Sequence, residues 1–300
     1  MSRRCLKMLK KNVETFMGCD ADYKDAKIVL FGAPFDSTTS FRPGTRFASA
    51  AIRRESYGLE LYSPYQDREL SEFSVFDSGD LELCFGDTKT ALSNIEKRAK
   101  TILTDGKLPF LIGGEHLVTL GSVRAAVKKY PDLHILHFDA HADLREDYLG
   151  ARLSHACVLR RCHELVGDHK IFQYGIRSGD KSEFVWGKDH VFTHKFDLEG
   201  LENTLNTLRG KPVYLTVDLD VLDPSVFPGT GTPEPGGVTF DALRGALTKV
   251  CSALDVVAAD VNELSPHYDQ SGASTAVACK IVREMLIALS ARIQNADNLF

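Results

Sequence analysis

Short apolar runs alternate with amphipathic stretches along most of the chain. The runs at 27–31, 108–112, 135–138 and 213–221 are mostly apolar and contain many β-branched and aromatic residues, which is typical of buried strands. Between such runs, apolar residues recur at helical spacing. The pattern predicts strands at 27–31, 73–76, 108–112, 135–138, 170–175, 213–221 and 254–261. It predicts helices at 48–54, 91–103, 118–129, 155–165, 197–208, 240–250 and 274–291.

An alternation of strands and helices of this kind predicts a parallel sheet with helices on both faces. The expected fold class is therefore α/β, a three-layer αβα arrangement with a mostly parallel central sheet. The chain has 300 residues, which is long for one domain but within the range of an open α/β sheet. No repeat, low-complexity segment or linker-like stretch divides it, so we predict one domain over residues 1–300.

Residues that can bind a metal follow the predicted strand at 135–138. Asp139, His141 and Asp143 occupy alternate positions, and alternate residues of an extended chain project to the same side. Two carboxylates and one imidazole could therefore converge just past the strand end. Oxygen ligands with a neutral imidazole suit Mn²⁺ better than they suit a structural Zn²⁺ held by thiolates. By itself the triplet also fits a polar strand exit with capping carboxylates.

Two other predicted strands end in residues of the same kind. Glu115 and His116 follow the apolar run LPFLIGG, and Asp218 and Asp220 close the run VYLTVDLDV. The carboxyl ends of parallel strands lie at one edge of a sheet, where the ligands of α/β proteins bind. The four aspartates and two histidines are too many for one ion, but they fit two ions that share carboxylates and activate a water. The six candidate metal ligands are His116, Asp139, His141, Asp143, Asp218 and Asp220.

Composition argues against several classes of function. No run approaches the roughly 18 apolar residues that a membrane span needs. A net charge of −5 and a pI of about 6.1 argue against a nucleic-acid-binding surface. The seven cysteines are scattered without a CxxC pair, which is typical of reduced thiols in an intracellular protein, here expected in the cytoplasm. The basic segment at 1–16 is expected to form a short amphipathic helix that packs on the body or on a neighbouring subunit, rather than a transit peptide.

Three motifs resemble those of the ureohydrolases, the arginase and agmatinase family. They are GGEH at 113–116, DAHAD at 139–143 and DLDVLDP at 218–224, in the order and approximate spacing of that family. SHACVLRR and PEPGG look more like the agmatinase branch, above all bacterial agmatinases, than like the arginase branch. The resemblance covers most of the chain, because it extends to RPGTR (42–46), SHACVLRR (154–161), GIRS (175–178), GTGTPEPGG (229–237), ELSP (263–266) and YDQSGASTA (268–276).

The resemblance implies an arginase-like fold and an enzyme with two Mn²⁺ ions per subunit. Such an agmatinase would hydrolyse agmatine, a small cationic guanidino compound, to putrescine and urea by means of a hydroxide that bridges the metals. Family members usually assemble as trimers or hexamers, so a homo-oligomer is expected. The resemblance assigns His116, Asp139, Asp143 and Asp218 to one ion and Asp139, His141, Asp218 and Asp220 to the other, so that Asp139 and Asp218 bridge.

The same resemblance assigns catalytic roles to two residues, and the chemistry of the reaction suggests a third. His155 matches the family's proton-shuttling histidine, and Glu263 matches the carboxylate that holds the guanidinium, so both would meet the substrate. Asp143 could hydrogen-bond the attacking hydroxide and pass its proton to the leaving amine.

The loop at 144–153 bears on the choice among guanidino substrates. Its Glu146 and Asp147 could accept the far ammonium of agmatine and would repel a carboxylate. Arg145 and Arg152 could instead turn inward and bind a carboxylate, which would favour 4-guanidinobutanoate. Arginine and formimidoylglutamate are further alternatives within the same chemistry, and a single-zinc deacetylase or a non-catalytic metal-binding protein are alternatives outside it.

Other histidines and arginines near these motifs are expected to have structural roles. His134 and His137 lie within a predicted strand and are expected to be packed or to support the ligands from behind. Arg42 and Arg46 are expected to brace their loop through ion pairs.

Overall fold

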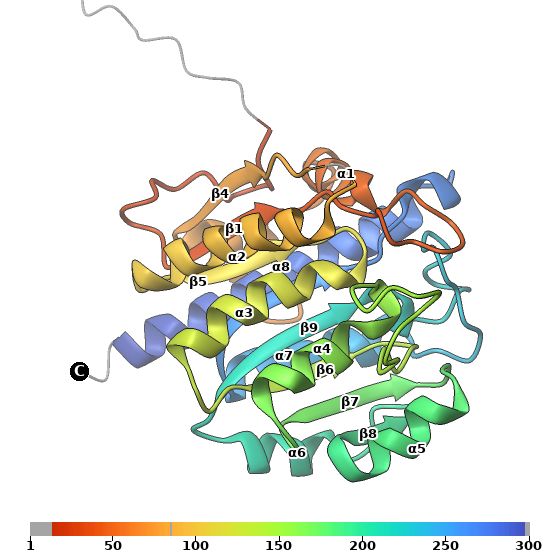
Figure 1. Ribbon diagram of the computed structural model, residues 1–300. Helices are drawn as coiled ribbons and strands as arrows, with labels where there is room; N and C mark the ends of the chain where they lie inside the picture. The colour runs from red at the N-terminus through yellow and green to blue at the C-terminus, as the bar shows by residue number, and fades with distance from the viewer. Residues whose placement is uncertain (1–13, 85, 298–300) are drawn as a thin grey trace, which may run out of the picture.

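An eight-stranded parallel sheet forms the centre of the protein. The computed structural model describes residues 14–84 and 86–297. Neighbouring strands of the sheet are all parallel, in the order β4-β1-β5-β10-β9-β6-β7-β8 (Figure 1). The strands are β1 (Ile28–Gly32), β4 (Val75–Asp80), β5 (Leu108–Ile112), β6 (His134–Phe138), β7 (Ile171–Ile176), β8 (Phe192–Lys195), β9 (Pro212–Asp218) and β10 (Asp255–Asn262). A separate antiparallel pair joins β2 (Tyr62–Ser63) to β3 (Arg68–Glu69).

Helices cover both faces of the sheet, as Figure 1 shows. Strand residues alternate between two apolar cores: Ile28 and Leu30 of β1 belong to one, and Val29 and Phe31 belong to the other. The first core contains residues of α1 (Ala48–Ser56), α6 (Leu201–Leu208), α7 (Phe240–Ala253) and α8 (Ala273–Asp297). The second contains residues of α2 (Thr88–Thr104), α3 (Thr119–Lys129) and α4 (Val158–Val166), with α5 (Lys181–His190) packed against it. The fold is therefore the predicted three-layer αβα arrangement.

The structure departs from the predicted elements in a few places. The strand expected at 213–221 ends at Asp218 and continues as a 3₁₀ turn over Leu219–Val221. The helix expected from residue 155 begins as a 3₁₀ turn, and α4 proper starts at Val158. The sequence analysis missed α5 and β8, because α5 has three consecutive apolar residues without a helical period and β8 is a half-exposed edge strand. The segment expected as an N-terminal helix lies, up to residue 13, outside the described residues.

The four middle strands bring the candidate ligands to one edge of the sheet. The chain passes from β5 to β6 and later fills the space between them with β9 and β10. Because the four strands are parallel, their carboxyl ends lie together, which is where open α/β sheets bind ligands.

The described residues bear on two expectations from composition, the absence of a membrane span and the state of the cysteines. Within residues 14–84 and 86–297, no helix is long and apolar enough to cross a membrane. Five buried cysteines are free thiols, namely Cys19, Cys157, Cys162, Cys251 and Cys279.

Gly114, which follows β5, lies against the backbone of Phe35. A Cβ placed on Gly114 would lie 2.1 Å from the Phe35 carbonyl oxygen, and the Glu115 N–H donates to that oxygen at 2.8 Å. Backbone atoms of Phe35 cannot relieve such a clash by a change of rotamer, as a flexible side chain could. Glycine at this position therefore allows the GGEH segment to pack against the segment that follows β1.

We expect Gly114→Ala to lower the free energy of unfolding by about 1–3 kcal/mol, the usual cost of overpacking a buried site. Urea denaturation followed by circular dichroism measures this change. The matched control is Gly245→Ala in α7, where an added Cβ meets no heavy atom within 4 Å. A helical Gly→Ala change of that kind should raise stability by up to about 1 kcal/mol. Similar effects of the two substitutions would contradict the close approach at Gly114.

Candidate metal centre

The candidate ligands surround one cavity at the carboxyl edge of the sheet. The cavity has a volume of about 230 Å³. Its walls also include His155 and Glu263, so the structure brings the predicted catalytic residues to the same place. Asp139 and Asp220 are buried and adjoin the wall residues. The four candidate ligands that line the cavity are His116, His141, Asp143 and Asp218.

A hydrogen-bond chain beneath His116 determines which ring nitrogen faces the cavity. The Thr216 hydroxyl donates to buried Asp260 at 2.6 Å, so its oxygen is left to accept from His116 Nε2 at 2.8 Å. Asp260 is held in turn by the Tyr214 hydroxyl at 2.5 Å. A proton on Nε2 leaves a lone pair on His116 Nδ1, which has no hydrogen-bond partner among the described residues.

His116 Nδ1 faces three carboxylate oxygens. The nearest oxygens of Asp139 and Asp143 are each 3.1 Å away, and that of Asp218 is 3.5 Å away. A lone pair directed at three anionic oxygens is repulsive unless a proton or a metal cation lies between them. Divalent metals stand about 2.0–2.2 Å from such ligand atoms, so this nitrogen and these oxygens could hold one ion.

A second group of ligand atoms shares Asp139 with the first. His141 Nδ1 lies 3.0 Å from Asp220 Oδ2 and 3.5 Å from Asp139 Oδ1. The Asp220 N–H donates to Asp218 Oδ1 at 2.9 Å, which keeps the Asp218 carboxylate beside this group. Because Asp139 Oδ2 faces His116 and its Oδ1 faces His141, one carboxylate spans both groups.

The pKa shifts reflect the crowding of buried acidic groups around the cavity. Burial and the charge of Asp139 raise the pKa of Asp143 to about 7. Burial, with the charges of Asp220 and Asp139, raises the pKa of Asp218 well above its usual range. Burial would lower the pKa of His116, but Asp139 and Asp143 outweigh it and raise that pKa. The groups thus hold protons that divalent cations would displace on binding.

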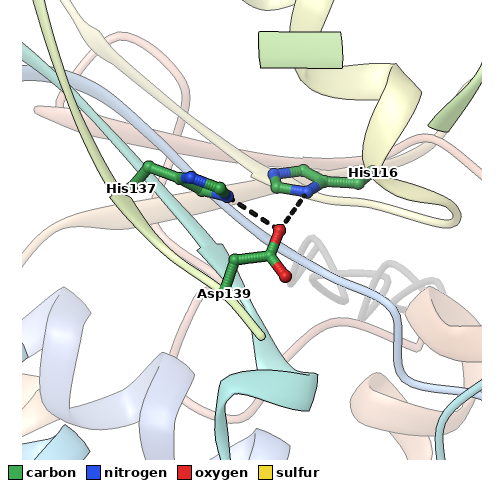
Figure 2. A group of neighbouring side chains, drawn as sticks. All are labelled: His116, His137 and Asp139. Atoms are coloured by element: carbon green, nitrogen blue, oxygen red, sulfur yellow. Dashed lines mark hydrogen bonds and ion pairs between the residues drawn. The ribbon is translucent and has the colours of Figure 1, made fainter. Parts of the chain in front are cut away.

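Figure 2 shows that His137 and His116 contact the same oxygen of Asp139 from two sides. His137 Nε2 donates to Asp139 Oδ2 at 2.8 Å, and its Nδ1 accepts from Gln173 Nε2 at 3.0 Å. The Gln173 amide is oriented because it also donates to the Ala142 carbonyl at 2.7 Å. Both ring nitrogens of His137 are therefore engaged, and the prediction of a packed residue is confirmed. His134 is also buried, and its Nδ1 bonds to the Asp132 carbonyl at 2.8 Å.

Asp143 reaches the cavity through a left-handed backbone. Its φ is 54°, a conformation that few residues other than glycine adopt. The strand before it ends at Phe138, so the prediction that extended alternation carries Asp143 to its neighbours is wrong. The Asp143 carbonyl accepts from the N–H groups of Leu159 and Arg160 in α4, and these bonds stabilise the turn.

Glu263 also has a left-handed backbone, with φ of 66°. Its Oε1 accepts the His116 N–H at 2.7 Å, and its own N–H donates to the Gly114 carbonyl at 3.0 Å. Burial, with the charges of Glu115 and Asp220, raises its pKa. The side chain is thereby fixed on the cavity wall beside Asp218.

His155 is held at the cavity wall by Thr38. The Thr38 hydroxyl donates to Glu115 Oε1 at 2.6 Å and accepts the His155 N–H at 3.1 Å. Burial lowers the pKa of His155 to about 4, so its imidazole is neutral at pH 7. Glu115 therefore positions His155 through Thr38, a role that the sequence analysis did not assign. The only sequence signal was a carboxylate directly after an apolar strand.

Arg177 is a second positioning residue that the sequence analysis did not single out beyond the motif GIRS. Its guanidinium ties the turn that carries Asp220 to the GTGTPEPGG loop. All the partners are backbone oxygens, and all but the Gly175 oxygen are distant in sequence, so no pattern of side chains indicates them. Arg177 donates, at 2.7–3.3 Å, to the carbonyls of Gly175, Asp220, Val221, Leu222 and Glu234.

The prediction that Glu146 and Asp147 face the substrate is wrong. Neither residue lines the cavity. Asp147 accepts the Gly150 N–H at 3.1 Å. Attraction to arginines on the same loop and on α4 draws Glu146 away from the cavity. Its ion-pair partners, at 2.5–3.4 Å, are Arg152, Arg160 and Arg161.

The arginines near the cavity differ in their roles. Arg145 lines the cavity and pairs with Glu183 at 3.4 Å, whereas Arg152 pairs with Glu146 and Glu164 and does not line it.

The loop that precedes α1 is braced in two ways. The predicted ion pair of Arg46 is confirmed, because it pairs with Asp36. Arg42 instead lies over the rings of Phe41 and Tyr268, at 5.0 and 5.4 Å from the centroids. Its brace is therefore a cation–π contact.

Comparison with known proteins shows to which family this chain belongs. A family model described as the arginase family matches residues 26–288. The agmatinase of Bacillus subtilis is 46% identical over 277 residues, which cover 91% of this chain and 96% of that protein. The guanidinobutyrase of Pseudomonas aeruginosa is 33% identical, with 90% and 88% covered. A solved structure from Clostridium difficile has a TM-score of 0.89 and 48% identity, covering 91% of this chain and 100% of that one. The chain belongs to the arginase family of ureohydrolases, enzymes that act on guanidino compounds.

Proposed function

We propose that this protein is an agmatinase, which hydrolyses agmatine to putrescine and urea with two bound divalent cations. The observation that carries the proposal is the Asp139 carboxylate, whose two oxygens face His116 and His141 and so span two groups of ligand atoms. The similarity to agmatinases over most of the chain supports the substrate. In this proposal, residues 1–300 act as one ureohydrolase domain.

Manganese is the expected metal at both positions. Oxygen-rich sites with one imidazole suit Mn²⁺ among the common divalent ions. When bound, two such ions supply Lewis acidity and make a water that they share easier to deprotonate. His116, Asp139, Asp143 and Asp218 would hold one ion, and Asp139, His141, Asp218 and Asp220 would hold the other.

Three side chains on the cavity wall would act on the substrate. Glu263 would bind the guanidinium by charge-assisted hydrogen bonds and orient its carbon towards the attacking water. Asp143 would take a proton from that water and return it to the leaving amine. His155, neutral because burial lowers its pKa to about 4, would exchange protons between the product amine and solvent.

Charge balance around the cavity supports a cationic substrate. Bound divalent cations would neutralise Asp143 and Asp218, which leaves Glu263 as a wall carboxylate that can pair with a cationic group of the substrate. The one arginine on the wall, Arg145, pairs with Glu183 at 3.4 Å and lies 3.9 Å from Asp180, so acidic neighbours balance its charge.

A second candidate substrate is 4-guanidinobutanoate. Arg145 is the cation that could bind its carboxylate if it left Glu183. The similarity to a guanidinobutyrase fits this alternative, although at lower identity than the similarity to agmatinases.

The expected assembly and compartment rest on less specific observations. The five buried free thiols support a reducing compartment, which we take to be the cytoplasm. We expect a homo-oligomer, a trimer or a hexamer, because the family to which the motifs point usually assembles in this way.

Asp139→Asn should weaken metal binding at both positions, because its two oxygens face both histidines. Manganese measured after gel filtration should fall from about two ions per chain to less than one, with loss of urea release. Asp147→Asn is the matched control, since Asp147 lies on the neighbouring loop outside the cavity. An Asp139→Asn protein that keeps both ions tightly bound would refute the bridging assignment.

His155→Ala should lower kcat by about 10- to 10⁴-fold, the range for a lost acid–base group. The manganese content should not change, because His155 is not among the assigned metal ligands and its Nδ1 contacts the hydroxyls of Thr38 and Ser154. Steady-state kinetics and metal analysis of the same sample test both expectations. Loss of metal in this variant would show that His155 has a structural role instead.

Agmatine should exceed arginine and 4-guanidinobutanoate in kcat/KM by at least about 100-fold, since an unmatched charge in a polar site costs several kcal/mol. Urea release from manganese-loaded protein, compared across the three compounds, measures the preference. Arg145→Gln is the diagnostic variant, because Arg145 could bind a substrate carboxylate. If the wild type cleaves 4-guanidinobutanoate as well as agmatine, and Arg145→Gln loses only the acid, the protein is a guanidinobutyrase.

A further inference from the structure

Two histidines and an aspartate form a cluster at the edge of the sheet opposite the candidate metal centre. His163 lies near the end of α4, Asp168 lies in the turn before β7, and His190 is the last residue of α5. Both β7 and β8 begin at this edge, whereas the cavity lies where strands end. The proposed reaction does not use this cluster.

Both histidines bond to the same oxygen of Asp168. His163 Nε2 is 2.7 Å and His190 Nδ1 is 2.5 Å from Asp168 Oδ1. Hydrogen bonds from His190 and His163 lower the pKa of Asp168 to about 2, so the carboxylate is ionised at neutral pH. One ligand atom from each residue lies within 4.8 Å of the other two.

This geometry matches a ligand set of two imidazoles and one carboxylate. Imidazole nitrogens suit Ni²⁺, Cu²⁺ and Zn²⁺, and a set of three leaves positions for water. Ligand atoms stand about 2.0–2.2 Å from such an ion, so the hydrogen-bond contacts would need to open by less than about 1 Å. Each neutral ring could admit the metal by moving its proton to its other nitrogen, with no net loss of protons.

Access from solvent distinguishes this cluster from a buried hydrogen-bond brace. The Asp168 side chain is 54% exposed, and the side chains of His163 and His190 are 16% and 31% exposed. The nearby cation Arg160, over the Trp186 ring, pairs with Glu146 at 3.1 Å, which offsets its charge. A divalent ion from solution could therefore reach the three ligand atoms.

We propose that His163, Asp168 and His190 form a separate binding site for a divalent transition-metal ion of the Ni²⁺, Cu²⁺ and Zn²⁺ class. The site would join the end of α4 to the end of α5, and a bound ion would replace the two hydrogen bonds that now connect them.

Trp186 provides a direct measurement of this site. It is the single tryptophan of the chain. Its ring stacks on His190 with centroids 4.1 Å apart and meets the edge of His163 at 4.7 Å. Open-shell ions such as Ni²⁺ quench indole emission at this short range, whereas Zn²⁺ has a filled d shell.

The test is a titration of the full-length, manganese-loaded protein with Ni²⁺, followed by Trp186 emission. We expect saturable quenching with one Ni²⁺ per chain and its reversal by excess Zn²⁺. Asp168→Asn and His190→Gln should each raise the Kd for Ni²⁺ by at least about tenfold, since even residues behind a metal's direct ligands change affinity by that much. Isothermal titration calorimetry of the same proteins gives the stoichiometry independently of fluorescence.

The matched control is His169→Asn. His169 is an exposed histidine next to Asp168, and asparagine tolerates its φ of 60°. This variant should retain the wild-type Kd for Ni²⁺, and unchanged urea release will show that all three variants fold. Equal Kd values for Ni²⁺ in the wild type and in both ligand variants, or quenching that does not saturate, would overturn the proposal.

Discussion

The burial of several carboxylates around one imidazole is the constraint on which the candidate metal centre depends. Asp139, Asp143 and Asp218 all face His116 Nδ1, and the charge of Asp139 disfavours the ionisation of the other two. Taking ionised carboxylates out of water is costly unless opposite charge or hydrogen-bond donors accompany them. The fold supplies donors on the protein side and leaves the remaining oxygens directed at a common space. A cation in that space would compensate the negative charge of these oxygens.

The surrounding hydrogen bonds hold this unfavourable arrangement in place before any cation binds. Thr216 and Asp260 set the tautomer of His116, and His137 fixes one oxygen of Asp139. Arg177 ties the Asp220 turn to a distant loop through backbone oxygens. Preorganisation of this kind matters because ligands and catalytic groups that are already in position need not be ordered during the reaction.

Ion pairs outside the cavity determine which charged side chains can contact the substrate. Glu146 is drawn towards arginines, and Glu183 balances Arg145, so these two charged side chains of the loop at 144–153 are paired and do not act singly on the substrate. Glu263, a wall carboxylate that the metal assignment leaves free, therefore favours a cationic group in the cavity. The same pairing restrains Arg145, a wall residue whose positive charge could recognise an acid.

Local patterns in the sequence determined the layers of the fold and the edge at which the ligands gather. The apolar runs at 108–112 and 135–138 predict the ends of β5 and β6 correctly, because burial and strand periodicity are local properties, whereas the run at 213–221 extends past the end of β9 at Asp218. Tertiary structure decided the rest. The left-handed turns at Asp143 and Glu263 are stabilised by bonds to α4 and to Gly114, and the direction of Glu146 depends on Arg160 and Arg161 of α4. These outcomes rest on partners that only the folded chain brings together, so no local pattern of residues could reveal them.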